Sequence, residues 1–219
     1  MSYKNEFKNC LDGLFESLCD VSDWMYENPE LGFQEFKTSK YLVDYIQKNS
    51  KSVNYPSHGL ETAFDITFGE EGPLTVICVE YDALPEIGHA CGHNIIATAS
   101  IGAGLGLKDI ASKLGIRVKL LGTPAEEGGG GKIILINEGA FEDASCSMMI
   151  HPGYEDVVNP TFTTIQQYTV EYFGKDAHAA GAPDQGINAL DAQIQLFVNA
   201  STYRCLLYTS DAADEHTGV

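Results

Sequence analysis

The chain has 219 residues, which is enough for one large domain or two small ones. Its formal net charge of -18 at pH 7 and its isoelectric point near 4.5 argue against nucleic acid or an anionic membrane surface as a partner. No run of the sequence approaches about 18 apolar residues, so we expect no membrane-spanning helix. The cysteines lack the spacing of a disulfide scaffold, which predicts a reducing, cytoplasmic location.

The amino-terminal segment is predicted to be a helix that packs on a folded domain. Its apolar side chains recur at three- and four-residue steps: Phe7, Leu11, Leu14, Phe15 and Leu18. Charged residues are interspersed among them, which is not the pattern of a signal peptide.

Three short apolar runs are predicted to be buried strands, over residues 73–80, 116–122 and 144–150. They are rich in β-branched or apolar residues and have no helical period. The segments between them favour helices, from Asn94 to about Leu114 and from Lys132 to Glu138. This order makes two β-α-β units, so the strands should be parallel.

The predicted helix ends follow from three residues. Asn94 is expected to cap the first helix, Gly115 to end it, and Gly139 to end the second. Right-handed crossovers would place both helices against the sheet. The fold class is therefore α/β, a mostly parallel sheet sandwiched by helices.

Side chains of the kinds that bind metal ions follow the predicted strands: Asp82, Cys91, His93, Glu126, Glu127 and His151. Because the carboxyl ends of parallel strands meet at one edge of a sheet, we expect these side chains to lie close together. Several acidic groups at one such edge require a cation, since buried charges are paired or coordinate metals. The sequence therefore predicts a metal site.

Two other sites are compatible with parts of this pattern. Residues 128–131 resemble a phosphate-binding loop, but Glu126 stands where a P-loop needs Gly, and Ile133 follows Lys132 where Ser or Thr is required. Two carboxylates would also repel a phosphate. A nucleophilic Cys91 with a histidine base is the second alternative, and it leaves both glutamates without a role.

The chain resembles the aminoacylase/carboxypeptidase amidohydrolases, which are clan MH metallopeptidases of peptidase family M-twenty. The motifs that carry the resemblance are Asn-Pro-Glu-Leu-Gly-Phe-Gln-Glu (28–35), Tyr-Asp-Ala-Leu-Pro (81–85), His-Ala-Cys-Gly-His (89–93), the Gly-Thr-Pro-Ala-Glu-Glu-Gly-rich stretch (122–131), His-Pro-Gly (151–153) and Ala-His-Ala-Ala (177–180). The run from Pro85 to Asn94 is most similar to the branch of the peptidase-M-twenty-domain-containing protein two dipeptidases and the aminobenzoyl-glutamate hydrolases.

The resemblance implies two divalent metal ions. Cys91 would be a thiolate that bridges them, His93 and His151 would be imidazole ligands, and Glu127 a carboxylate ligand. Sulfur, nitrogen and oxygen ligands together suit zinc, and manganese or cobalt would also fit.

The resemblance also implies catalytic roles for two carboxylates. Glu126 would be the general base that takes a proton from a metal-activated water, and Asp82 would accept a hydrogen bond from a ligating imidazole. The implied reaction is hydrolysis of the amide bond of a dipeptide or an N-acyl amino acid. The alternative is a non-catalytic fragment or binding module that retains the motifs.

The organisation changes near residue 160. Residues 1–160 are predicted to be the amino-terminal part of the catalytic domain, and residues 161–203 the start of an inserted α+β lid and dimerisation domain. Within it we expect a strand over residues 166–173 and a helix over residues 186–199. The helix should turn these side chains inward: Ile187, Leu190, Ile194, Phe197 and Val198.

Two expectations concern the remainder of the chain. His178 matches the family histidine that contributes to the substrate site, often across a homodimer. Residues 204–219 are predicted to be a non-native tail, because the stretch from Cys205 back-translates to a sequence resembling the transposon-end adapter of sequencing libraries. The second half of the catalytic domain, with the last metal-ligating histidine, would then be missing. We therefore expect the parent protein to be the enzyme and this fragment to be inactive.

Overall fold

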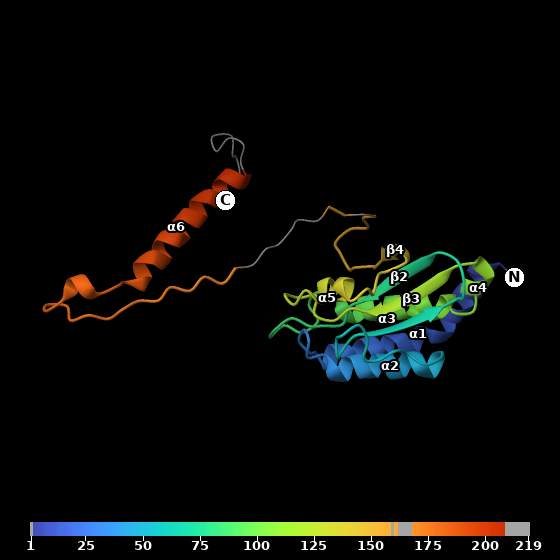
Figure 1. Cartoon of the computed structure of the whole chain (residues 1–219). Helices are drawn as coiled ribbons and strands as arrows, with labels where there is room; N and C mark the ends of the chain where they lie inside the picture. The colour runs from blue at the N-terminus through green and yellow to red at the C-terminus, as the bar shows by residue number, and fades with distance from the viewer. Residues whose placement is uncertain (1, 159, 162–167, 209–219) are drawn as a thin grey trace. The chain divides into compact units, whose positions relative to one another are not determined.

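The computed structural model describes residues 2–158, 160–161 and 168–208 (Figure 1). The chain divides into two compact units, Met1–Asp156 and Val157–Val219, and each is described by itself. No described helix is long and apolar enough to cross a membrane.

The first unit contains a four-stranded sheet with the strand order β1-β3-β2-β4. The strands are β1 (Phe64–Phe68), β2 (Leu74–Val79), β3 (Arg117–Gly122) and β4 (Ala144–Met148). β2 pairs in parallel with both β3 and β4, which confirms the three predicted parallel strands. β1 was not predicted, and it pairs antiparallel with β3.

The described residues of this unit form five helices: α1 (Tyr3–Glu27), α2 (Phe36–Asn49), α3 (His93–Leu107), α4 (Ala111–Leu114) and α5 (Gly131–Asn137). The predicted amino-terminal helix and the helix after the Gly-rich loop are both present. Of the apolar residues at helical spacing in α1, Phe15 is 66% exposed. Leu14 already faces the core, and the next residue on a helix points about 100° away.

The predicted helix from Asn94 to Leu114 is wrong in two details. A tight turn at residues 108–110 separates α3 from α4 and lets Ile110 become buried. The residue that precedes α3 is Gly92, in the left-handed conformation with φ 86°, so Asn94 lies inside the helix. Its side chain donates instead to Ser22 Oγ at 3.0 Å and ties α3 to α1. Gly115 ends α4 with φ 66°, as expected.

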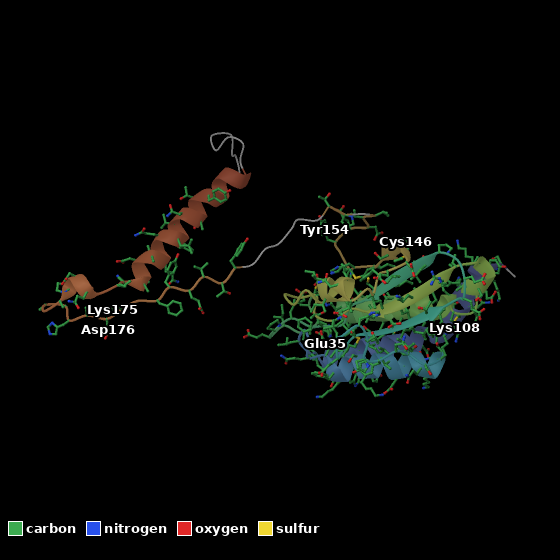
Figure 2. All side chains as sticks on the ribbon, in the orientation of Figure 1. Glu35, Lys108, Cys146, Tyr154, Lys175 and Asp176 are labelled. Atoms are coloured by element: carbon green, nitrogen blue, oxygen red, sulfur yellow. The ribbon has the colours of Figure 1, made fainter. Side chains whose placement is uncertain are left out.

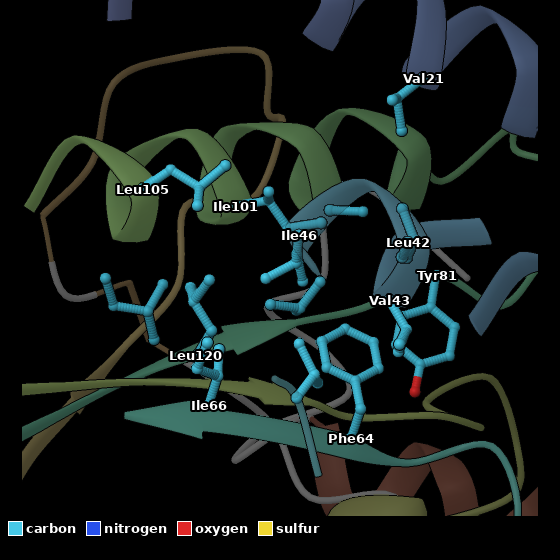
Figure 3. Close-up of a cluster of buried hydrophobic side chains, with 14 of the residues drawn as sticks. Val21, Leu42, Val43, Ile46, Phe64, Ile66, Tyr81, Ile101, Leu105 and Leu120 are labelled. Atoms are coloured by element: carbon cyan, nitrogen blue, oxygen red, sulfur yellow. The ribbon is translucent and has the colours of Figure 1, made fainter. Parts of the chain in front are cut away.

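The sheet is covered on both faces. α1, α2 and α3 bury the larger core against one face, where Ile101 and Leu105 of α3 lie above Ile66 and Leu120 of the sheet (Figure 3). A smaller cluster lies on the other face, where Leu135 of α5 packs with alternate strand residues. The crossover from β2 to β3 and the crossover from β3 to β4 run in opposite directions across the sheet, so right-handed connections place α3 and α5 on opposite faces.

The second unit contains α6 (Ala189–Tyr208), a short 3-10 turn (Pro183–Gln185), and an isolated antiparallel bridge between Lys175 and Ile187 (Figure 2). The strand predicted over residues 166–173 lies partly outside the described residues, and residues 168–173 form no strand. The predicted helix exists but begins at Ala189, where Asn188 Oδ1 accepts the N–H of Leu190.

The prediction that the apolar side chains around α6 point inward is wrong within this unit. These side chains are more than half exposed: Ile187, Leu190, Ile194, Phe197 and Val198. No described element of the unit packs a second layer against the helix, so its apolar residues have no core to enter. Of the predicted tail, residues 204–208 belong to α6 and residues 209–219 lie outside the described part of the chain.

Candidate metal centre

The predicted ligand residues of the first unit gather where β2 and β3 end. Asp82 follows β2 by three residues, and His93 is the first residue of α3. Glu126 and Glu127 lie in the loop between β3 and α5, and His151 follows β4. The connections that follow the adjacent strands β2 and β3 go to opposite faces of the sheet, and ligand sites of open α/β sheets form at such points.

Asp82 orients two other parts of the site. His93 Nδ1 lies 2.8 Å from the Asp82 carbonyl oxygen and 3.0 Å from Asp82 Oδ1, and both oxygens accept hydrogen bonds. Nδ1 therefore carries the ring proton, which leaves Nε2 free to bind a cation. The other Asp82 oxygen, Oδ2, accepts the backbone N–H of Glu127 at 2.8 Å.

Carboxylate oxygens surround the free nitrogen of His93. Glu80 Oε2 lies 3.5 Å, Glu126 Oε2 3.8 Å and Glu127 Oε1 3.9 Å from His93 Nε2. His93 and Glu80 are fully buried, and neither Nε2 nor Glu80 Oε2 has a hydrogen-bond partner among the described residues. Two unpartnered buried polar atoms that face each other are costly unless a cation joins them.

Cys91 and His151 form the more exposed part of the site. Cys91 Sγ lies 3.5 Å from His151 Nε2, and His151 Nδ1 donates to the Pro152 carbonyl at 2.8 Å. The rings of His93 and His151 lie edge to face, with their centroids 6.2 Å apart. Gly92 permits this approach, because a Cβ there would stand 2.9 Å from Pro152 Cγ.

The electrostatics of the site favour a cation. Burial would raise the pKa of Asp82, but the hydrogen bonds from His93 and Glu127 N–H outweigh it and lower that pKa. Burial would lower the pKa of His93, but Asp82 and Glu80 outweigh it and raise that pKa. Burial, followed by the neighbouring carboxylates, raises the pKa of Cys91 to about 12. An unassisted Cys91 thiol is therefore a poor nucleophile at neutral pH.

The donor atoms fit a metal centre. Two groups each place one ligand atom per residue within 4.8 Å of one another, Cys91 with His93 and His151, and Glu80 with His93 and Glu126. His93 belongs to both groups, and its one free nitrogen, Nε2, can bind a single ion. Thiolate, imidazole and carboxylate donors are a set that zinc accepts.

The 28–35 motif supports the loop that carries Glu126. The buried Glu35 accepts the N–H of Ala125 at 2.8 Å and the hydroxyl of Thr62 at 3.0 Å. Ala125 has a positive φ of 56°, an uncommon conformation for a residue with a side chain. A Cβ at Gly32 would lie 3.1 Å from Ala125 Cα, so this glycine lets the motif approach the loop closely.

Sequence reasoning missed Glu80, Lys132 and Glu35 as parts of this region. Glu80 stands two residues before Asp82. Its Oε1 accepts a hydrogen bond from Lys132 Nζ, and the two side chains form an ion pair. Its position directly after a buried strand was the available signal.

The predicted substrate residue His178 belongs to the second unit, where its Nδ1 accepts the N–H of Gly181 at 2.9 Å.

No protein-family model matches the chain. It is 38% identical over 208 residues to Xaa-Arg dipeptidase of Mus musculus, an alignment that covers 89% of this chain and 48% of that protein. It is 31% identical over 193 residues to a p-aminobenzoyl-glutamate hydrolase subunit of Escherichia coli, an alignment that covers 79% of this chain and 40% of that protein. The chain thus spans about half the length of the curated relatives it matches.

Solved structures share the fold of this chain over part of its length. A dinuclear metal binding peptidase from Bacillus subtilis superposes with a TM-score of 0.55 at 25% identity, covering 62% of this chain and 42% of that one. An aminobenzoyl-glutamate utilization protein from Klebsiella pneumoniae superposes with a TM-score of 0.56 at 22% identity, covering 68% of this chain and 46% of that one.

Proposed function

Since the chain belongs to the aminoacylase/carboxypeptidase amidohydrolases of peptidase family M-twenty, we propose that its parent protein is a two-metal hydrolase. The bond cleaved is the amide bond of a dipeptide or an N-acyl amino acid. One observation supports this most directly: His93 Nε2 is buried without a hydrogen-bond partner among the described residues and faces three carboxylates beside a Cys-His pair.

Four residues are proposed to hold the two divalent ions: Cys91, His93, Glu127 and His151. Zinc is our first expectation because sulfur and nitrogen donors are present, with manganese and cobalt as alternatives. When bound, such ions polarise a carbonyl and make a water acidic near neutral pH.

Glu126 is proposed as the general base. Its side chain is 43% exposed, against 26% for Glu127, so it has more access to substrate. The backbone of Glu127 is fixed by Asp82, which suits a residue that must hold an ion. Glu126 would take a proton from the attacking water and return it to the leaving amine.

Asp82 is proposed to act through its neighbours. Its carboxylate holds the His93 ring in one tautomer and at the same time holds the N–H of Glu127. It thereby orients a nitrogen ligand and an oxygen ligand together. A lowered pKa keeps this carboxylate ionised across the neutral range.

We also propose the division of the chain. Residues 1–160 would be the amino-terminal part of the catalytic domain, and residues 161–203 the start of a lid and dimerisation domain that brings His178 to the substrate. The two compact units divide at Asp156, which supports a boundary close to residue 160. A homodimer in the cytoplasm and a non-native tail over residues 204–219 complete this proposal.

The proposed substrate is a dipeptide that ends in a basic residue. The relatives with 38% and 36% identity are named Xaa-Arg dipeptidases, and the net charge of -18 favours a cationic substrate over an anionic one. An aminobenzoyl-glutamate-like substrate is the second candidate, because the 31% identical relative is named for that reaction.

The test compares β-alanyl-lysine and β-alanyl-arginine with an acyl-glutamate, using the full-length protein loaded with zinc. We expect a higher kcat/KM for the two basic dipeptides. A clear preference for the acyl-glutamate would contradict the substrate assignment while leaving the hydrolase assignment intact. No turnover of any of these, combined with failure to bind metal, would favour the non-catalytic binding module.

A further inference from the structure

The carboxylate of Glu80 is the most deeply buried acidic group of the site that has no assigned role. It follows β2 directly and is 1% exposed. Its Oε1 is paired with Lys132 Nζ, but its Oε2 has no hydrogen-bond partner among the described residues. An ionised carboxylate in this position needs a second cationic or donor group.

The ion pair with Lys132 does not by itself explain this arrangement. Lys132 remains 30% exposed, and it approaches only one of the two carboxylate oxygens. A buried ion pair is stabilising only when its remaining polar atoms are also satisfied. The ion pair therefore leaves Glu80 Oε2 and the facing His93 Nε2 without a hydrogen-bond partner among the described residues.

The distance between these two atoms matches that between two ligands of one ion. Ligand atoms about 2.1 Å from a tetrahedral zinc lie about 3.4 Å apart along an edge of the tetrahedron. Glu80 Oε2 and His93 Nε2 are 3.5 Å apart, and Glu126 Oε2 lies 3.8 Å from the same nitrogen. The separation is long for a hydrogen bond between a ring nitrogen and a carboxylate.

We propose that Glu80 is a further metal ligand, which shares with His93 the more buried of the two ions. Lys132 holds the other carboxylate oxygen and so fixes the direction in which Glu80 Oε2 points. Lys132 stands in the first turn of α5, directly after the Gly-rich loop, so the loop that carries Glu126 and Glu127 is tied to the same carboxylate. This inference rests on the proposed function and adds a ligand to it.

Cobalt(II) binding to the metal-stripped full-length protein tests the inference through affinity and visible absorption. We expect Glu80→Gln, which keeps the size of the side chain, to bind cobalt at least about tenfold more weakly than the wild type. Lys132→Met should reduce the affinity for cobalt less than Glu80→Gln does, because it removes only the contact that orients Glu80. Glu71→Gln is the matched control: it removes the same charge from an exposed turn and should bind as the wild type does.

The outcomes separate this inference from the proposed function. If the wild type binds cobalt and a folded Glu80→Gln variant binds it equally well, Glu80 is not a ligand and the hydrolase proposal is unaffected. If the wild type binds no cobalt, the proposed metal centre itself is wrong, and this inference with it. A crystal structure of the metal-loaded wild type decides without a variant: Glu80 Oε2 within about 2.5 Å of an ion supports the inference, and more than about 3.5 Å overturns it.

Discussion

At the scale of single residues, the two adjacent glutamates have different surroundings and should have different functions. In the full-length protein, Glu126→Gln should lower kcat by a factor of about 10²–10⁴ while the protein keeps its metal, because only the proton acceptor is removed. Glu127→Gln should lose metal as well as activity. Metal content by mass spectrometry beside kcat checks this, and equal metal loss in both variants would contradict the division of roles.

The thiol and imidazole of the site should make metal binding depend on pH. The pKa of Cys91 is raised to about 12, so in the metal-free chain its thiol holds a proton that a bound ion must displace, and the raised pKa of His93 moves any competition between proton and metal at its ring to higher pH. Affinity should therefore rise with pH, by up to about tenfold per unit for each proton released.

Isothermal titration in buffers of different ionisation enthalpy measures this proton release directly. Cys91→Ser should release fewer protons than the wild type. Metal affinity that stays constant between pH 6 and 8 would mean that the Cys91 thiolate is not a ligand.

Some of these residues could be predicted from the sequence and others could not. Asp82, Cys91, His93 and the adjacent glutamates stand at strand ends within distinctive motifs, so their convergence follows from the order of elements. Glu80 also follows a strand directly, but a glutamate at such a position is usually solvated, so its place in the sequence did not by itself indicate a role in the site. Its burial depends on Lys132, which is distant in the sequence and close in space only after α5 has packed.

At the scale of secondary-structure elements, Glu35 should stabilise the loop between β3 and α5. Glu35→Ala would leave the buried N–H of Ala125 and the hydroxyl of Thr62 without their acceptor, which costs about 1–3 kcal/mol. Glu35→Gln can still accept one of these bonds and should cost less. Urea unfolding of the chain measures both variants against Glu61→Ala, an exposed control; equal stability of Glu35→Ala and that control would rule out the supporting role.

Two glycines should respond oppositely to alanine. A Cβ at Gly131 would stand 1.9 Å from the carbonyl oxygen of Pro124, so Gly131→Ala must displace the backbone of the Glu126 loop and destabilise the first unit. Gly13 lies exposed within α1 with no atom within 4 Å of a built Cβ, so Gly13→Ala should stabilise the chain by about 0.5–1 kcal/mol. Thermal unfolding measures the pair, and destabilisation by Gly13→Ala would refute the helix-propensity argument.

The elements show why sequence reasoning missed β1 and joined α3 to α4. The stretch Phe-Asp-Ile-Thr-Phe (64–68) alternates apolar and polar residues, so the strand itself was predictable. Its pairing with β3 was not, since that depends on contacts far along the chain. The turn at residues 108–110 has no Gly or Pro to mark it, and Lys108 there donates to the Asn49 carbonyl at 2.5 Å, a tertiary contact.

At the scale of the whole molecule, the α/β arrangement places the proposed metal ligands of the first unit at one edge of the sheet. The parallel core strands were predictable because apolar runs alternate with helical segments. The second unit was predicted less well, since its apolar helix residues are exposed within that unit. Its contribution to the site, through His178, stays a prediction.

Metal dependence of hydrolysis is the most direct test of the central proposal. The full-length protein should be stripped with a chelator and assayed on β-alanyl-arginine before and after zinc is added back, with metal content measured in parallel. We expect activity to disappear with the metal and to return as zinc approaches two ions per chain. Undiminished hydrolysis by the metal-free protein would contradict the two-metal hydrolase.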